Sequence, residues 1–170
     1  MPRKAIRILG IDPGLRTTGW GLVEAEGSRL SFIACGTVCS DAADGLGLRL
    51  RMLHVGLAAV IADYRPDEAA IEETFVNRDP QSALKLGHAR AIGMVVPALA
   101  GIDVHEYAAN LVKKTVVGVG HADKKQVATM VRLLLPRSDA RSADAADALA
   151  VAICHAQHRA ARILQARVLA

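Results

Sequence analysis

The chain has 170 residues, the length of one domain (1–170) that can bury a core without disulfides or a structural zinc ion. Hydrophobic residues make up 52% and charged residues 22%, which excludes a disordered tail, and no apolar run reaches the roughly 18 residues of a membrane span. The net charge is +4, and the three cysteines have no CxxC spacing, which favours reduced thiols in a cytoplasmic protein.

The first third of the chain predicts three strands and a helix. Residues 6–11 are an apolar run that Asp-Pro-Gly ends, which is typical of a buried central strand. Residues 18–24 and 30–38, joined by a turn at 26–28, predict two more strands in antiparallel order. Apolar residues then recur at spacings of three and four over residues 46–64, which predicts a helix.

The rest of the chain alternates strands and helices. Residues 68–72 and 102–107 predict two strands, with a helix between them that starts at Asp79-Pro80 and is limited by Pro97. Three further helices are predicted over residues 108–116, 123–135 and from 142 onwards. This order predicts an α/β fold with a mixed five-stranded sheet, in which three antiparallel strands are followed by parallel crossovers and helices flank the sheet.

Two carboxylates come at the ends of predicted strands. Asp12 ends the first strand, and Glu72 ends the strand at 68–72, with Glu73 beside it pointing to the opposite face. Ligands of open α/β sheets bind at the carboxyl ends of parallel strands, so both positions favour a functional site. The alternatives are turn chemistry for Asp-Pro-Gly and an ordinary strand-end acid for Glu72.

Two more carboxylates share one face of the last predicted helix. Asp144 and Asp147 are three residues apart in an alanine-rich segment. Acids in a first helical turn also favour the helix dipole, which is the alternative explanation. Burying two carboxylates on a seam of small residues, however, costs desolvation unless a cation binds there.

Together, Asp12, Glu72, Asp144 and Asp147 predict a pocket of oxygen ligands. Crowded carboxylates take up protons unless cations neutralise them, and hard oxygen ligands select Mg²⁺, with Mn²⁺ as a substitute. Two such ions suit in-line phosphodiester cleavage, since one lowers the pKa of the attacking water and the other stabilises the departing oxygen. His155 and His158 have no partners at zinc spacing, which favours structural or surface histidines. With the four acids set aside, the basic residues clearly exceed the acidic ones, which suits a polyanion.

Five motifs occur in order along the chain: ILGIDPG at 8–14, AIE at 70–72, SALKLG at 82–87, TVVG at 115–118 and ADAADALA at 143–150. The set resembles the RuvC family of bacterial Holliday-junction resolvases, in the RNase H-like superfamily, over about residues 5–160. The resemblance implies an RNase H-like fold and a homodimeric, Mg²⁺-dependent endodeoxyribonuclease. Such an enzyme resolves four-way DNA junctions by paired symmetric nicks in recombination and repair, and the RuvA–RuvB branch-migration complex is its implied partner.

The resemblance also assigns roles to single residues. The family's motif acids fall on the same four carboxylates, Phe75 falls where a side chain stacks on an unpaired base, and Lys113 and Lys124 fall on positions that contact DNA near the cut. The candidate DNA-binding residues are Phe75, Arg78, Lys113, Lys114, Lys124 and Lys125. The alternatives are a hydrophobic staple for Phe75 and a solvated face for the lysines.

Three other functions compete with this prediction. Residues 10–19 also resemble the phosphate loop of actin-like ATPases, although 170 residues leave no room for the second domain that those proteins need. A non-catalytic DNA-binding module and an RNase H-like nuclease with another substrate are the other two. Symmetric cutting predicts a dimer, and the helix at 81–96 is the candidate interface because Leu84, Leu86, Met94 and Val95 exceed what one core face needs.

Overall fold

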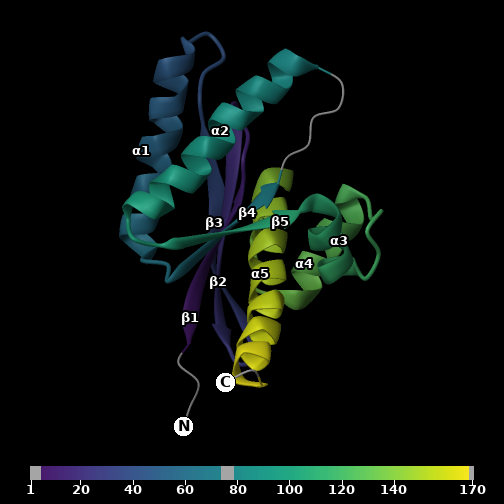
Figure 1. The fold of residues 1–170 in the computed structure, drawn as a ribbon. Helices are drawn as coiled ribbons and strands as arrows, with labels where there is room; N and C mark the ends of the chain where they lie inside the picture. Colours follow the sequence, from purple (N-terminus) through teal and green to yellow (C-terminus); the bar gives the residue numbers. More distant parts are fainter. Residues whose placement is uncertain (1–4, 74–78, 169–170) are drawn as a thin grey trace.

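A single mixed sheet organises the chain (Figure 1). The computed structural model describes residues 5–73 and 79–168, and the side chains among them except those of residues 160 and 162–168. Its strands lie in the order β3-β2-β1-β4-β5. β1 pairs antiparallel with β2 and parallel with β4, β2 pairs antiparallel with β3, and β4 pairs parallel with β5. The strands are β1 (Ile6–Asp12), β2 (Thr17–Glu26), β3 (Arg29–Cys39), β4 (Glu68–Glu73) and β5 (Asp103–Ala108). The predicted α/β fold is therefore confirmed.

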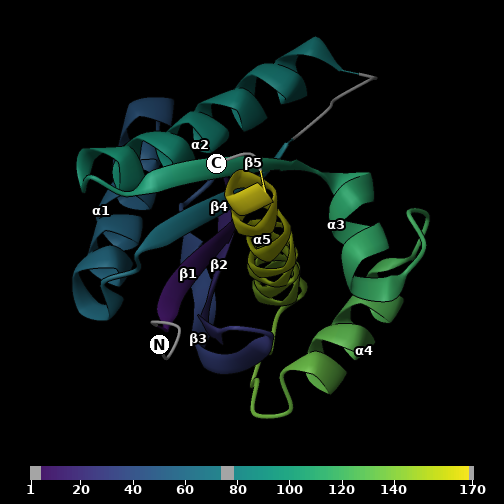
Figure 2. The same ribbon diagram turned by 60° about the horizontal axis from the view of Figure 1, so that its bottom comes forward.

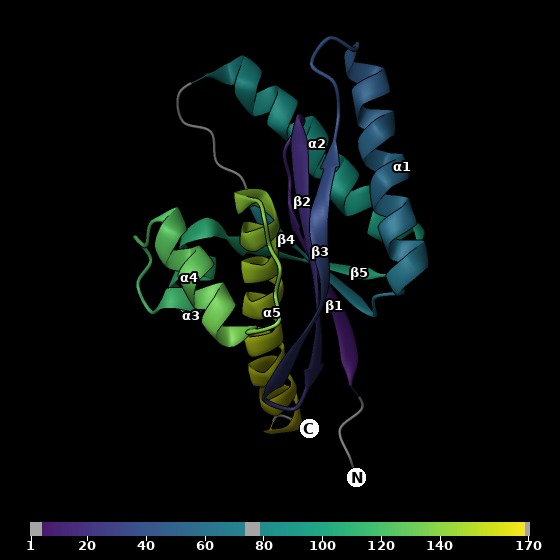
Figure 3. The ribbon, with the colours of Figure 1, turned by 180° about the vertical axis from the view of Figure 1, so that it is seen from behind.

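Helices cover both faces of the sheet. The helices α1 (Leu46–Tyr64) and α2 (Pro80–Leu99) lie on one face, as Figure 3 shows from behind. On the other face α5 (Ala143–Val168) lies along the sheet, with α3 (Ala109–Val117) and α4 (Lys124–Leu134) beside it (Figure 2). In the described part of the chain, none of these helices combines the length and apolarity needed to span a bilayer.

The helix ends follow the predicted chemistry, with one difference. Asp79 caps α2 by accepting hydrogen bonds from the backbone N–H groups of Gln81 and Ser82, and Asp123 forms a capping box at the start of α4. We expected Pro97 to limit α2, but the helix continues to Leu99. Pro97 removes only one N–H donor, and its carbonyl still accepts hydrogen bonds from the N–H groups that follow, which allows one more turn.

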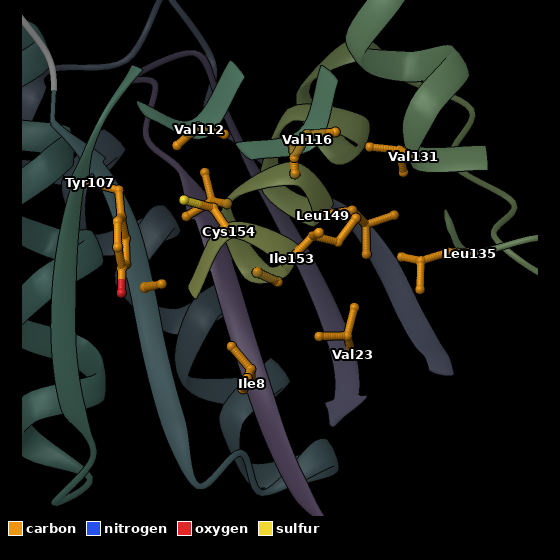
Figure 4. Close-up of a cluster of buried hydrophobic side chains, with 14 of the residues drawn as sticks. Ile8, Val23, Tyr107, Val112, Val116, Val131, Leu135, Leu149, Ile153 and Cys154 are labelled. Carbon is orange, nitrogen blue, oxygen red and sulfur yellow. The ribbon is translucent and has the colours of Figure 1, made fainter. Parts of the chain in front are cut away.

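The first part of α5 is buried against glycines of the central strands. A Cβ atom on Gly10 would lie 2.0 Å from the carbonyl oxygen of Ala148, and one on Gly19 would lie 2.0 Å from that of Asp144. Glycine at these positions lets the helix backbone touch the sheet directly. The core on this side joins β1, β2 and α5 to α3 and α4, and Figure 4 shows Ile8, Leu149 and Ile153 within it. The start of α5 is thereby placed over the ends of β1 and β4.

Candidate active site

The predicted strand-end acids lie side by side at one edge of the sheet. The parallel register pairs Ile11 of β1 with Ile71 of β4, so Asp12 and Glu72, which follow them, are neighbours. Side chains alternate along each strand, which directs Asp12 and Glu72 to the face that α5 covers and Glu73 to the other face. The structure therefore separates the two adjacent glutamates by face.

The turn after Asp12 is closed by Thr18. Its hydroxyl donates to the carbonyl oxygen of Gly14 at 2.8 Å, and its oxygen lies 3.3 Å from the Gly14 backbone N–H, which donates to it. Thr18 is buried, so water does not compete for these bonds. The sequence analysis did not single out this residue, because a threonine within a strand carries no distinctive signal.

The helical acids come from the beginning of α5. Ser142 precedes the helix, and its hydroxyl oxygen accepts the backbone N–H of Ala145 at 3.1 Å, as an N-cap residue does. Asp144 and Asp147 follow in the first two turns, partly buried, and both face the strand-end acids closely enough to interact with their charges. The structure thus brings together the four acids that the sequence predicted.

The electrostatics of these acids favour a bound cation. Burial raises the pKa of Asp12 to about 7, and the charges of Asp147, Glu72 and Asp144 add to the effect. Burial also raises the pKa of Glu72, with a further contribution from Asp147. Like charges and desolvation both penalise the ionised forms of Asp12 and Glu72, so a bound cation would favour their ionisation.

Two lysines supply part of that positive charge. Lys124 Nζ lies 3.1 Å from Asp147 Oδ2, and this pairing raises the lysine's pKa. The positive charges of Lys113 and Lys124 also lower the pKa of Glu72, against the effect of burial. Lys114 and Lys125, the next residues in each pair, are exposed on α3 and α4. One lysine of each predicted pair therefore faces the acids.

Two predicted DNA-binding residues, Phe75 and Arg78, lie outside the described residues.

The cysteines Cys35, Cys39 and Cys154 are free thiols, as their spacing in the sequence predicted.

A second polar cluster lies toward the opposite end of β4 and was not predicted. Glu68, His105 and His155 bring possible ligand atoms within 4.8 Å of one another. Among the described residues no three of the four predicted acids bring their ligand atoms so close together. His155 is fully buried and hydrogen-bonded, which agrees with the structural role expected for it. The cluster combines residues of β4, β5 and α5, so no local sequence motif predicts it.

Known proteins resemble this chain in both sequence and fold. The family described as crossover junction endodeoxyribonuclease RuvC matches residues 8–155. The protein of that name from Methylocella silvestris is 70% identical over 164 residues, which cover 96% of this chain and 93% of the relative. Its counterpart from Beijerinckia indica is 69% identical over 154 residues, covering 91% of this chain and 88% of that protein.

Solved structures agree with the sequence comparison. The structure of Thermus thermophilus RuvC in complex with Holliday junction substrate matches with a TM-score of 0.85 and 33% identity, over 92% of this chain and 96% of that one. The yeast mitochondrial Holliday junction resolvase Ydc2 matches with a TM-score of 0.65 at 11% identity, over 95% and 83% of the two chains, which shows a shared fold alone. The RNase H-like fold is confirmed, and the ATPase alternative is not supported. The chain belongs to the RuvC family of crossover junction endodeoxyribonucleases.

Proposed function

We propose that this chain nicks four-way DNA junctions symmetrically in the cytoplasm, by Mg²⁺-dependent phosphodiester hydrolysis at Asp12, Glu72, Asp144 and Asp147. The observation that carries the proposal is that four acids from two strands and a helix lie near one another at one edge of the sheet, where burial and the neighbouring acids raise the pKa of Asp12 to about 7. A protein gains nothing in stability from such crowding, whereas a cation site requires it. The family's name and the junction-bound relative support four-way DNA as the substrate.

The donor set fits the proposed metal. All four side chains offer carboxylate oxygens, which Mg²⁺ and Mn²⁺ prefer, and no thiol or imidazole is among them. The ammonium group of Lys124 already lies against Asp147, so the site attracts positive charge in the absence of metal. When bound, divalent cations would supply an activated water and stabilise the departing 3′-oxygen.

The remaining residues have distinct tasks in this proposal. Lys113 and Lys124 lie beside the acids and would hold the phosphate that is cut, while the exposed Lys114 and Lys125 would contact the DNA backbone farther away. Phe75 remains the predicted stacking contact near the junction centre, and Arg78 remains a predicted DNA contact. Ionic contacts of this kind make the affinity for the junction strongly dependent on salt.

Two matched cuts require two active sites related by a twofold axis, so we propose a homodimer. The outer face of α2 supports this, because Leu84, Val95 and Leu99 are 66%, 47% and 75% exposed. Of the four predicted interface residues, Met94 is instead partly packed against the core between α1 and the sheet, and Leu86 is half-buried. The RuvA–RuvB complex remains the partner implied by the family resemblance.

Nicking of a synthetic mobile four-way junction tests the function. The wild type is expected to make paired nicks with Mg²⁺ and none with EDTA, and Asp12→Asn is expected to bind the junction without cutting it. Linear duplex and an RNA–DNA hybrid serve as competing substrates. Equal cleavage of either one would favour a different RNase H-like nuclease, and binding without metal-dependent cleavage in the wild type would favour a DNA-binding module.

A further inference from the structure

A buried network of polar side chains joins α5 to β4 and β5 away from the active site. His155 of α5 is fully buried, and its Nε2 atom lies 2.7 Å from Glu68 Oε2. The other ring nitrogen, Nδ1, lies 2.8 Å from the Tyr107 hydroxyl. Arg159, one turn farther along α5, donates from Nε to both carboxylate oxygens of Glu68 at 2.7 and 2.9 Å. Glu68 therefore receives bonds from two successive turns of the helix.

This network is satisfied without a metal ion. Burial by itself would raise the pKa of Glu68, but the hydrogen bonds from Arg159 and His155 lower it below its ordinary value. An ionised carboxylate only accepts, so Nε2 of His155 carries the proton. A divalent cation between Glu68, His105 and His155 would have to displace that proton and would meet the guanidinium of Arg159. The geometry therefore favours a fixed hydrogen-bonded contact over a second metal site.

The opposite end of the same helix is under electrostatic repulsion. Asp144 and Asp147 at the start of α5 face Asp12 and Glu72, and their charges raise the pKa of Asp12. The first turns of α5 meet glycines of the sheet through backbone atoms and alanine side chains. These small groups allow close approach, but they interlock less than large side chains do. Leu149 and Ile153 pack into the core farther along α5, and directional bonds beyond them would further fix the position of the helix along the sheet.

Two rigid elements of similar length, α5 and β4, link the acids Asp147 and Glu72 to the contact between His155 and Glu68. Asp147 and His155 are eight residues apart on α5, about 12 Å of helix. Glu72 and Glu68 are four residues apart on β4, about 13 Å of strand. The helix runs away from the active site while the strand runs toward it, so a contact between Glu68 and His155 fixes how far Asp147 lies from Glu72.

We propose that Glu68, His155 and Arg159 are positioning residues that set the spacing between Glu72 on β4 and Asp147 on α5, and thereby the affinity of the active site for its metal. The inference rests on the proposed function of those acids. It gives a role to a network that contains none of the four acids, and it places the residues that tune metal affinity two turns of α5 away from Asp147.

Metal binding to Glu68→Ala tests the proposal directly. Mn²⁺ affinity of the protein without DNA is measured by electron paramagnetic resonance, and the Mg²⁺ concentration for half-maximal nicking is measured in parallel. Both are expected to weaken by about tenfold, as when an outer-shell partner is lost. The maximal rate at saturating Mg²⁺ and the affinity for the junction in EDTA are expected to stay near wild-type values. Glu68→Gln keeps the size and one acceptor oxygen but replaces the other oxygen with an NH2 donor, so it is expected to recover only part of the affinity.

Two matched controls separate positioning from stability. Glu106→Ala removes an acid that pairs with Arg90 of α2 and does not touch α5, and Leu57→Ala weakens the core on the other face of the sheet. Neither is expected to change Mn²⁺ affinity. Wild-type affinity in Glu68→Ala, or an equal loss in Leu57→Ala, would overturn the positioning role. Zn²⁺ binding that Glu68→Ala abolishes would overturn it in favour of a second metal site. A wild type that neither binds Mn²⁺ nor cuts would instead contradict the proposed function itself.

Discussion

Lys124 Nζ lies 3.1 Å from Asp147 Oδ2, so a side chain from α4 places its positive charge on an acid that we assign to the metal site. The lysine side chain is 71% exposed and that of Asp147 is 19% exposed. The more exposed partner is thus the cation, which would leave Asp147 on metal binding and remain within reach of a phosphate.

Lys124→Ala is expected to separate metal affinity from catalysis. Without the competing ammonium, Mn²⁺ binding to the free protein should tighten by about two- to threefold, since an exposed ion pair contributes under about 1 kcal/mol. Nicking at saturating Mg²⁺ should nevertheless slow, because the phosphate loses a contact. Lys125→Ala is the matched control, and it should weaken junction binding slightly and leave Mn²⁺ affinity unchanged. Equal effects of the two substitutions would show that Lys124 has no special relation to Asp147.

Asp144→Asn should abolish nicking and spare binding. We expect the single-turnover rate to fall by at least about 100-fold, the scale of losing one electrostatic contributor to a transition state. Junction affinity in EDTA should remain, because phosphate contacts supply most of it. Asp139→Asn, at an acid that lies beside Cys35, is the control and should cut normally. If binding falls as much as cleavage does, Asp144 has a structural role instead.

The raised pKa of Asp12 predicts how stability changes with pH. The folded protein holds this proton up to about pH 7, whereas the unfolded chain releases it near the ordinary aspartate pKa of 3.8. Between these values the folded state binds more protons, so the contribution of Asp12 to the free energy of unfolding falls as pH rises. In EDTA, Asp12→Asn should therefore melt higher than the wild type at pH 8, and the difference should shrink toward pH 4.

Mg²⁺ should reverse this trend, because it binds the ionised carboxylate and stabilises the wild type more at pH 8 than at pH 5. Thermal melts with Mg²⁺ and with EDTA at each pH provide the measurement. A stabilisation by Mg²⁺ that is equal at both pH values, or that persists in Asp12→Asn, would contradict the assignment of Asp12.

Gly10→Ala should damage both the fold and the site. The new Cβ would lie 2.0 Å from the Ala148 carbonyl oxygen and 2.7 Å from the Ala152 nitrogen, both backbone atoms of α5. We expect the free energy of unfolding in urea to fall by about 3 kcal/mol, with weaker Mg²⁺ binding as α5 moves outward. Gly47→Ala in α1 meets no atom within 4 Å and should stabilise by about 0.5–1 kcal/mol. An unchanged free energy of unfolding in Gly10→Ala would contradict the direct contact between helix and sheet.

A charge on the outer face of α2 should disrupt the proposed dimer. Leu84→Glu replaces a side chain that is 66% exposed, so it should leave the monomer fold stable. In light scattering at micromolar protein, the wild type should be a dimer and the variant a monomer that no longer makes paired nicks. Leu133→Glu, at an equally exposed leucine on α4, is the control and should remain dimeric. A monomeric wild type would remove α2 as an interface.

Local signals in the sequence were sufficient for the element order and for picking out four acids that the structure places near one another. Asp12 and Glu72 could be recognised because each directly follows a buried strand, and Asp144 and Asp147 because three residues separate them on a helix. Periodicity, capping and strand ends depend on neighbouring residues, so they can be read along the chain. The extension of α2 past Pro97 shows where such local rules are less exact.

The tertiary structure shows how the members of adjacent pairs are placed relative to the acids. Alternation put Glu72 and Glu73 on opposite faces, but only the position of α5 shows that Glu72 lies on the acidic side. Packing of α3 and α4 likewise turned Lys113 and Lys124 toward the acids and left Lys114 and Lys125 in solvent. The contact between Glu68 and His155 joins residues 87 positions apart, and its bonds exist only after β4 and α5 have packed together. Chemistry that needs several elements at one place depends on contacts between distant residues, and no local spacing encodes them.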